Sequence, residues 1–259
     1  MAENGKLADR AAIVTGGGGA IGGAIARLFA AEGAAVLVVD IDGAAAARTV
    51  ADIAGAGGRA VAYAGDVAEE ATAAGAVAGA IAAFGGVHVL VNVAAAMTPD
   101  APVESMALAD WNRAFAVNIG GPFLMCKHAV PRLRAAGGGA IVNIASQLGR
   151  IGVPRRADYC STKAALIHFT TILAAEVARD RIRVNSVSPG VIETPRTRRR
   201  FDTAEAFRAA RGPLHMLGRV GRAEEVARAA LFLASDDASF TTATDLLVDG
   251  GYIFLKRPE

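Results

Sequence analysis

The stretch AAIVTGGGGAIGGAIARLFAAEGAAVLVVD, residues 11–40, decides the fold. It opens with a short apolar run, Ala11 to Thr15, which is typical of a buried strand and leads into four consecutive glycines. Ile21 to Ala31 then has helical character, and Val36 to Val39 is a continuous run of aliphatic residues that ends at Asp40. Strand, glycine-rich turn, helix and strand in this order predict a βαβ unit with two buried parallel strands.

The same alternation continues along the rest of the chain. Helical stretches of ten or more residues separate most of the later apolar runs. Further strands are predicted at 60–64, 87–93, 140–145, 183–187 and 246–248. Alternating strands and helices predict an α/β fold, in which helices cover both faces of a parallel sheet. No linker, repeat or low-complexity segment splits residues 1–259, so we expect a single domain.

Composition narrows the class of protein. The 259 residues are 53% hydrophobic and 20% charged, which excludes a disordered chain. The uncharged stretch 71–99 has the length of a membrane span, but Gly85, Gly86, His88 and Asn92 interrupt it, so it is better interpreted as helix, turn and strand. The chain does not open with a basic segment followed by an apolar one. We therefore expect a cytoplasmic protein with no membrane partner.

The two cysteines, Cys126 and Cys160, both fall in predicted helices. Their spacing is not typical of a metal site or of a disulfide framework. We interpret both as reduced core thiols and expect no bound metal.

The glycine-rich turn predicts a dinucleotide site. Glycines between strand and helix let backbone N–H groups approach a pyrophosphate, and the helix N-terminus adds about half a positive charge. Asp40 follows about 20 residues later, where a carboxylate accepts hydrogen bonds from ribose hydroxyls and repels a 2′-phosphate. Neither the turn nor the residues directly after Asp40 include Lys or Arg. The pattern favours NAD over NADP; the alternative is a simple turn and a strand-end Asp.

Tyr159 and Lys163 form a second informative pair, because the chain holds only three Tyr and four Lys. On a helix, side chains four residues apart share a face, so the Lys163 ammonium can approach the Tyr159 phenol. A cation there favours phenolate and would bring the phenol pKa towards neutrality, which suits a general acid and base. Ser146 ends an apolar run thirteen residues earlier. The alternative is a helix with an exposed Tyr and Lys and no chemistry.

Taken together, these motifs resemble the short-chain dehydrogenase/reductase family from about residue 6 to residue 252. Thr15, Gly16 and Gly22 match the family's TGxxxGxG turn, with Ala20 in place of its middle glycine. The resemblance implies a Rossmann-type, doubly wound parallel sheet of about seven strands in one NAD-binding oxidoreductase domain. It also implies a homotetramer, since residues 247–251 are similar to a C-terminal signature that is commonly a subunit contact.

Other segments match the family in part. Asp66-Val67 is similar to the segment that contacts the adenine ring, whereas residues 92–95 read Asn-Val-Ala-Ala where Asn-Asn-Ala-Gly is usual. His88 stands where Asp is common, and we expect a strand-start histidine without chemistry. The resemblance implies these cofactor contacts: Thr15, Gly16, Gly18, Gly19, Ala20, Ile21, Gly22, Asp40, Ile41, Asp66, Val67, Asn92, Ala94, Tyr159, Lys163, Pro189, Gly190, Ile192 and Thr194.

The resemblance also implies four catalytic residues: Asn118, Ser146, Tyr159 and Lys163. Hydride would pass between nicotinamide and the carbon of a secondary alcohol or ketone. Tyr159 would exchange a proton with the substrate oxygen, which Ser146 polarises, while Lys163 lowers the phenol pKa and Asn118 holds a water for proton relay.

Positive charge is concentrated beside these residues. Between residues 196 and 211, six arginines stand against two carboxylates, a net charge of +4, whereas the whole chain carries +2. This segment belongs to the one interruption of the strand and helix rhythm, about 189–218, a loop with a short helix that covers the substrate in the resembled family. Arg150, Arg155 and Arg156 lie on a second loop that we expect beside the same cleft. Guanidinium groups bind carboxylates and phosphates, whereas a solvated lid or subunit contact is the alternative.

The sequence thus predicts an NAD-dependent oxidoreductase that interconverts a secondary alcohol and a ketone. Its small-molecule substrate would be anionic, as a hydroxy acid, a diol carboxylate or an acyl thioester is. The alternatives are a 3-oxoacyl thioester reductase, a neutral sugar or polyol dehydrogenase, and a non-catalytic NAD-responsive binding protein, against which the intact Ser146, Tyr159 and Lys163 argue. The basic segment is too short and too poor in aromatic residues for a nucleic-acid partner.

Overall fold

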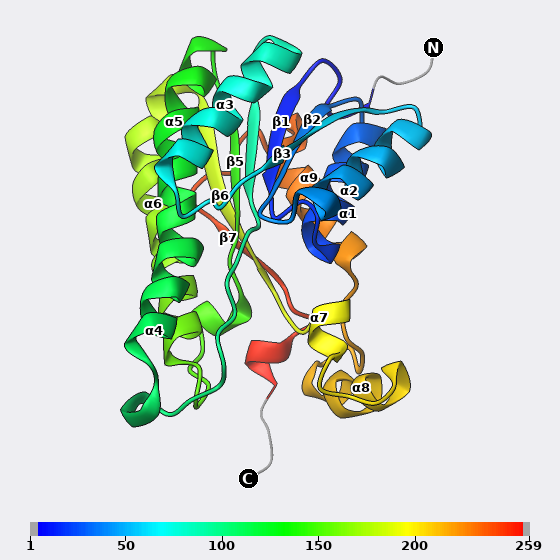
Figure 1. Cartoon of the computed structure of the whole chain (residues 1–259), viewed down its shortest axis with the longest axis vertical. Coiled ribbons are helices and arrows are strands. Elements are labelled where there is room, and N and C mark those ends of the chain that lie inside the picture. Colours follow the sequence, from blue (N-terminus) through cyan, green and yellow to red (C-terminus); the bar gives the residue numbers. More distant parts are fainter. Residues whose placement is uncertain (1–4, 256–259) are drawn as a thin grey trace.

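Seven parallel strands form one sheet in the order β3-β2-β1-β4-β5-β6-β7 in the computed structural model, which describes residues 5–255 (Figure 1). The sequence-predicted α/β class and parallel sheet are therefore confirmed. The strands are β1 (Ala11–Thr15), β2 (Ala35–Asp40), β3 (Arg59–Ala64), β4 (Val89–Asn92), β5 (Gly139–Ile144), β6 (Ile182–Pro189) and β7 (Asp245–Val248).

Three helices pack on each face of the sheet (Figure 1). One face carries α1 (Ala20–Ala31), α2 (Gly43–Gly55) and α9 (Ala223–Ala234). The other carries α3 (Glu70–Phe84), α5 (Gly121–Ala135) and α6 (Ala157–Val177). Helices cover both faces of the sheet, so inner strands such as β1 and β2 are buried on both sides and do not alternate between apolar and polar residues.

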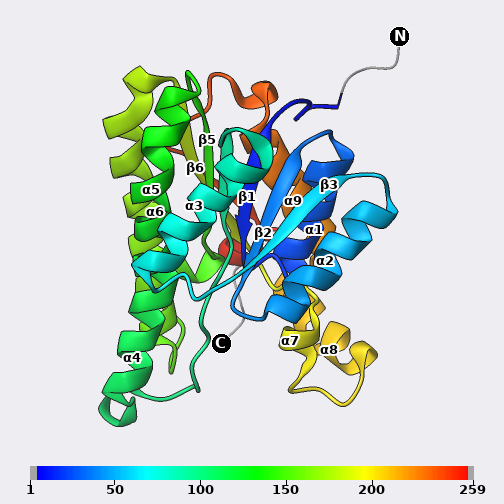
Figure 2. The same cartoon turned by 45° about the horizontal axis from the view of Figure 1, so that its top comes forward.

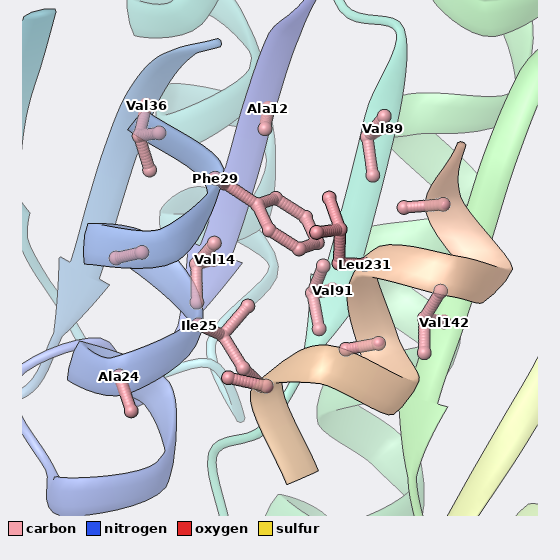
Figure 3. Close-up of a cluster of buried hydrophobic side chains, with 14 of the residues drawn as sticks. Ala12, Val14, Ala24, Ile25, Phe29, Val36, Val89, Val91, Val142 and Leu231 are labelled. Atoms are coloured by element: carbon pink, nitrogen blue, oxygen red, sulfur yellow. The ribbon is translucent and has the colours of Figure 1, made fainter. Parts of the chain in front are cut away.

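Alternate residues of β1 supply the two halves of the core. Ala12 and Val14 point to the α1 side, where Phe29 of α1 and Leu231 of α9 pack on them, whereas Ile13 belongs to the opposite cluster (Figure 3). Every residue of β1 is buried. The period of two along a strand thus divides one apolar run between two cores.

Residues 189–218 differ from the expected loop with one short helix. They contain two short helices, α7 (Pro195–Arg198) and α8 (Ala204–Arg211), and a further helical turn at Gly212–Leu214. Thr194 caps α7 and Thr203 caps α8, each by accepting a hydrogen bond from a backbone N–H three residues on. Each helix begins at a single threonine within an arginine-rich stretch. The sequence pattern therefore did not distinguish two helices there.

The carboxyl ends of the strands meet at one end of the molecule, where α4 (Leu108–Phe115), α7 and α8 extend beyond the sheet (Figures 1 and 2). β1 pairs with β2 on one side and with β4 on the other, so the direction of winding reverses at β1. Ligand sites of open α/β sheets lie outside the carboxyl ends at such a switch point. The fold therefore places the site here.

Candidate active site

A cavity of about 790 Å³ opens at the carboxyl ends of the strands. It runs from Asp40 and Arg48 at one end to Tyr159 and Arg199 at the other. Apart from Thr15 and Asn92, all the sequence-predicted cofactor residues line it, as do three of the four predicted catalytic residues. Its volume lies in the range of small-molecule and cofactor sites.

The turn between β1 and α1 has no room for a side chain at Gly16 and Gly22. Gly16 has φ +62°, and a Cβ there would lie 2.8 Å from the backbone nitrogen of Ala94. A Cβ on Gly22 would lie 2.2 Å from the carbonyl oxygen of Gly16. The backbone can thus approach a pyrophosphate closely at the N-terminus of α1, so the residues present fit a nicotinamide dinucleotide.

Asp40, at the end of β2, lines the cavity beside the glycine-rich turn. Its carboxylate accepts hydrogen bonds from the backbone N–H groups of Gly18, at 2.9 Å, and Asp42, at 3.0 Å. Arg48 of α2 also lines this end of the cavity, and its Nη2 lies 4.0 Å from a carboxylate oxygen of Asp42. The sequence argument missed Arg48, because it considered only the residues directly after Asp40 and not the second turn of the next helix.

Asp66 and Val67 line the adjacent wall. Burial alone would raise the pKa of Asp66, but the N–H of Ala68 and the guanidinium of Arg113 together hold it below its usual value. The Arg113 Nη1 lies 2.7 Å from the Asp66 carboxylate. Arg113, on α4, is a second cavity residue without a sequence signal, since its partner lies 47 positions earlier in the chain.

Thr15 and Asn92 support the cavity from below. The buried Thr15 hydroxyl accepts hydrogen bonds from the N–H groups of Val93, at 3.0 Å, and Ala94, at 3.3 Å. Asn92 is buried and donates to Asn143 of β5 at 2.8 Å. The departures from the family pattern at residues 93 and 95 therefore leave this segment hydrogen-bonded to its neighbours.

Ser146, Tyr159 and Lys163 converge at the other end. Ser146 follows β5, its hydroxyl accepts a hydrogen bond of 3.1 Å from the N–H of Leu148, and it also hydrogen-bonds Tyr159. Tyr159 and Lys163 lie one turn apart on α6, as the sequence predicts. Lys163 is only 2% exposed, and its Nζ donates to the carbonyl oxygen of Ile144 at 2.8 Å.

The electrostatics of this pair differ from the expectation. Burial raises the pKa of Tyr159, although the hydrogen bond with Ser146 and the charges of Arg196 and Arg156 oppose the rise. Burial, assisted by Arg196, lowers the pKa of Lys163 to about 7. In the protein alone, Lys163 therefore does not bring the phenol pKa towards neutrality, because desolvation penalises the charge of both groups.

Asn118 is buried behind the cavity wall, in a π-helical turn, Ala116–Gly120, between α4 and α5. Its amide accepts from the N–H of Ala96 at 2.8 Å and donates to the Ala96 carbonyl at 3.2 Å and to Thr162 at 3.1 Å. Three hydrogen bonds thus tie the turn to Ala96 and Thr162, and they use both N–H groups of the amide. One acceptor position of Oδ1 is left for the expected water of a proton relay, which stays a prediction.

Comparison with known proteins matches this geometry to a family. Residues 18–253 fit the family model described as enoyl-(acyl carrier protein) reductase. A cyclohexanol dehydrogenase from Acinetobacter sp. (strain SE19) is 39% identical over 95% of this chain and 96% of its own. The chain belongs to the short-chain dehydrogenase/reductase family. It is thus an oxidoreductase that acts on CH–OH donors and binds a nicotinamide cofactor.

Two further relatives of this short-chain dehydrogenase/reductase extend the comparison. A cis-4-hydroxycyclohexanecarboxylate dehydrogenase from Sinomonas cyclohexanicum is 42% identical over 95% of this chain and 97% of that protein. A crystal structure assigned to a short-chain dehydrogenase/reductase from Burkholderia xenovorans has a TM-score of 0.91 and 36% identity, and covers 98% of this chain and 100% of that one.

Most of the arginines around this short-chain dehydrogenase/reductase site are paired away from the cavity. Arg150 binds Asp245 of β7 at 2.6 Å and Arg155 donates to the Asp100 carbonyl, so neither lies beside the cleft as expected. Arg156 lines the cavity but contacts Asp100 at 2.6 Å. In the segment 196–211, Arg198 and Arg208 form ion pairs with Glu193, and Arg200 forms one with Asp100. Arg211 stacks on Phe201.

Arg196 and Arg199 are the exceptions. Both line the cavity, and neither forms an ion pair with any carboxylate of residues 5–255. Arg196 donates one hydrogen bond, of 3.3 Å, to the carbonyl of Ala95. Its charge acts on both Tyr159 and Lys163. Uncompensated positive charge of the arginine-rich segment therefore acts on the part of the cavity that Tyr159 and Lys163 line.

Asp245 connects the loop after Ser146 to β7. Its carboxylate is buried and accepts hydrogen bonds from the hydroxyls of Ser186, at 2.7 Å, and Ser188, at 2.8 Å, besides Arg150. Arg150 ends the helical turn Gln147–Gly149 that follows Ser146. This set of contacts fixes the back of the Ser146 loop to β6 and β7.

Proposed function

We propose that the protein is an NAD-dependent dehydrogenase that interconverts a secondary alcohol and a ketone in a substrate that also carries a carboxylate. The observation behind the anionic substrate is the position of Arg196, a guanidinium without an ion-pair partner among the described residues, in the same cavity as Tyr159. A guanidinium in a partly enclosed cavity binds a carboxylate through charge-assisted hydrogen bonds. The relative named for cis-4-hydroxycyclohexanecarboxylate, a ring alcohol with a carboxylate, supports this choice.

The chain's own residues would divide the proton chemistry. Tyr159 takes the proton of the substrate hydroxyl during oxidation and returns it during reduction. Ser146 hydrogen-bonds the same oxygen and keeps it facing the phenol. Lys163, with a pKa of about 7, changes its charge near neutral pH and so adjusts the field at Tyr159. When bound, the nicotinamide ring supplies hydride transfer.

The choice of NAD over NADP rests on Asp40. A carboxylate at the end of β2 accepts hydrogen bonds from the two ribose hydroxyls of NAD and repels the 2′-phosphate of NADP. Gly18, Gly19 and Ile21 would hold the pyrophosphate at the start of α1. Pro189, Gly190, Ile192 and Thr194 line the opposite side of the cavity and would hold the nicotinamide.

A neutral ring alcohol or polyol is the second candidate substrate class. The relatives named for cyclohexanol and for D-threitol, the latter from Mycolicibacterium smegmatis, favour it. Arg199, which lies at the exposed rim of the substrate segment, would then remain solvated. A 3-oxoacyl thioester reductase has weaker support, from the description of the matching family model alone.

A kinetic comparison tests the carboxylate proposal. The rate constant kcat/KM is measured with NAD for 4-hydroxycyclohexanecarboxylate and for 4-methylcyclohexanol, a neutral analogue. In Arg196→Ala we expect kcat/KM to fall about tenfold more for the acid than for the neutral alcohol. Arg198→Ala is the matched control, because Arg198 lies on the same helix but pairs with Glu193 outside the cavity. Equal losses for both alcohols would rule out an electrostatic role for Arg196.

The assembly we propose is a homotetramer, as the family resemblance implies. Large apolar side chains are exposed on α5 and α6, at Phe123 and Ile172, and on the opposite side near β7, at Phe232 and Phe240. Two separate apolar surfaces suit the two kinds of contact that a tetramer of two dimers needs. Light scattering of the purified protein tests this state, and a monomer would contradict it.

We also infer a cytoplasmic location. Within residues 5–255, no helix has the length and apolar character needed to cross a membrane. Cys126 and Cys160 are both free thiols, which suits a reducing compartment. Fractionation of the native host, with the protein followed by antibody, tests the location.

A further inference from the structure

Gln147 is a buried polar residue that no part of the catalytic scheme uses. It follows Ser146 directly, lines the same cavity and is only 3% exposed. Its Oε1 is buried without a hydrogen-bond partner, whereas its Nε2 is not among the buried unpaired atoms, although it bonds no residue of 5–255. The amide therefore has no partner within the described chain, and its accessible end is available to a ligand in the cavity.

The surroundings of Gln147 hold this amide in place. Its backbone carbonyl accepts hydrogen bonds from Arg150, at 3.0 Å, and Ile151, at 3.2 Å, so the helical turn after Ser146 is fixed. On the other side, Oε1 lies within 3.1 Å of the position that a Cβ on Gly190 would occupy. The amide is confined between the Ser146 loop and the end of β6 and is not free to turn out into solvent.

The accessible end of the Gln147 amide has no partner in the chain, so a ligand group that replaces its water can hydrogen-bond it. Rotation by 180° about χ3 exchanges its oxygen and nitrogen at almost the same shape, so Gln147 can present an acceptor or a donor to the cavity. A hydroxyl group, which both donates and accepts, satisfies either orientation. The missing partner is thus best supplied by a hydroxyl of a bound ligand.

We propose that Gln147 hydrogen-bonds a second hydroxyl of the substrate, on the carbon next to the reacting carbinol, and so makes the enzyme selective for vicinal diols and dihydroxy acids. This inference rests on the proposed dehydrogenase function. Ser146 and Tyr159 bind the reacting oxygen, and Gln147 is the chain neighbour of Ser146. Two oxygens on adjacent carbons can therefore meet adjacent side chains, whereas a mono-alcohol offers no second hydroxyl to the Gln147 amide.

Gln147→Leu tests the proposal, because leucine has a similar size but neither donates nor accepts. The value of kcat/KM with NAD is measured for cyclohexane-1,2-diol against cyclohexanol and for 2,3-butanediol against 2-butanol. All four alcohols are neutral, so Arg196 does not affect the comparison. We expect the wild type to prefer the diols and Gln147→Leu to lose about tenfold to hundredfold on the diols while the mono-alcohols change less than about threefold.

Controls separate this role from a packing effect. Met97→Leu alters another side chain that lines the cavity without removing a polar group, and should leave the ratio of diol to mono-alcohol unchanged. If Gln147→Leu unfolds at the assay temperature, Gln147→Met supplies the same loss of hydrogen bonding in a more flexible side chain.

Three outcomes would overturn the proposal. Equal losses on diols and mono-alcohols would show that Gln147 acts on the fold or on the reacting oxygen. A weakened Kd for NADH, measured by its fluorescence, with an unchanged substrate ratio would assign the amide to the nicotinamide carboxamide. A wild type without any preference for diols would overturn this inference alone, since the proposed dehydrogenase function requires only that secondary alcohols are oxidised.

Discussion

The Nζ of Lys163 lies 5.8 Å from the centroid of the Tyr159 ring, and it donates its hydrogen bond to the main chain of β5. The two groups share one face of α6, but both are buried, and each loses solvation when it becomes charged. Burial therefore favours the uncharged amine and phenol over an ammonium and a phenolate.

Lys163 should make the stability of the cofactor-free protein depend on pH. Its pKa in the folded protein, about 7, lies below the ordinary value of 10.5, so between these pH values the unfolded chain binds a proton that the folded chain does not. Its contribution to the free energy of unfolding is therefore least favourable below pH 7 and improves as the pH rises towards 10.5.

Urea unfolding of wild type and Lys163→Met between pH 6 and 10 measures this effect. We expect the stability of the wild type relative to the variant to increase by a few kcal/mol across that interval. Shifts of groups that lie far from Lys163 cancel in the difference to first order. A pH-independent difference would place the Lys163 pKa near its ordinary value.

Tyr159 should give alcohol oxidation a rising pH profile. Because burial holds the pKa of its phenol above the ordinary value, the fraction able to accept a proton increases with pH. Tyr159→Phe should lower kcat by about a thousandfold or more, while the Kd for NAD changes only a few-fold. If Tyr159→Phe retained most of the activity, Tyr159 would not be the group that accepts the proton.

The charge of Arg196 should determine the pH at which the rate of alcohol oxidation rises. Its charge lowers the pKa of Tyr159, so Arg196→Ala is expected to move the rising limb of kcat/KM to higher pH. A neutral alcohol is the proper substrate here, since it excludes an effect on substrate binding. Arg198→Ala, whose guanidinium pairs with Glu193, should leave the limb where it is. A shift to lower pH in Arg196→Ala would contradict the field argument.

Asp40 should control the choice of cofactor. Asp40→Asn keeps an oxygen that accepts from the N–H of Gly18 or Asp42 and removes the charge, while Arg48 stays at the same end of the cavity. We expect the ratio of kcat/KM with NADP to that with NAD to rise about tenfold to hundredfold. Asp52→Asn, on the outer side of α2 beside Arg27, is the control. An unchanged ratio would show that other residues select the cofactor.

Gly22 should be irreplaceable in the cofactor cradle. A Cβ at this position meets the Gly16 carbonyl at 2.2 Å, which forces the turn to open. Gly22→Ala should therefore lower Tm and weaken NAD binding by at least about tenfold. At Gly55, which lies at the end of α2 and has no atom within 4 Å of a Cβ, alanine should be neutral or stabilising. Similar effects of the two substitutions would contradict the steric argument.

The fold could be predicted from the sequence because its strongest signals are local. The apolar runs fixed the strands to within about two residues, since buried parallel strands such as β2 are almost continuously aliphatic. The spacing of Tyr159 and Lys163 likewise predicted their shared helical face. Both patterns depend on neighbours along the chain, which a sequence displays directly.

The parts of the site that the sequence did not reveal depend on distant partners. Arg150 was expected beside the cleft, but Asp245, 95 residues later, holds it on the other side of the Ser146 loop. The pKa of Lys163 follows from its depth in the fold and not from its spacing to Tyr159. Gln147 carried no signal, because an unsatisfied amide is recognisable only when its surroundings are known.

The buried carboxylate of Asp245 has a consequence for the biosynthesis of the enzyme. The ribosome completes β1, β4, β5 and α6, with Ser146, Tyr159 and Lys163, well before it adds Asp245 on the last strand. A nascent chain can thus assemble most of its sheet while the loop behind Ser146 still lacks its anchor. The loop behind Ser146 therefore gains its anchor only after β7 has been made, and chains that end before Asp245 would lack it.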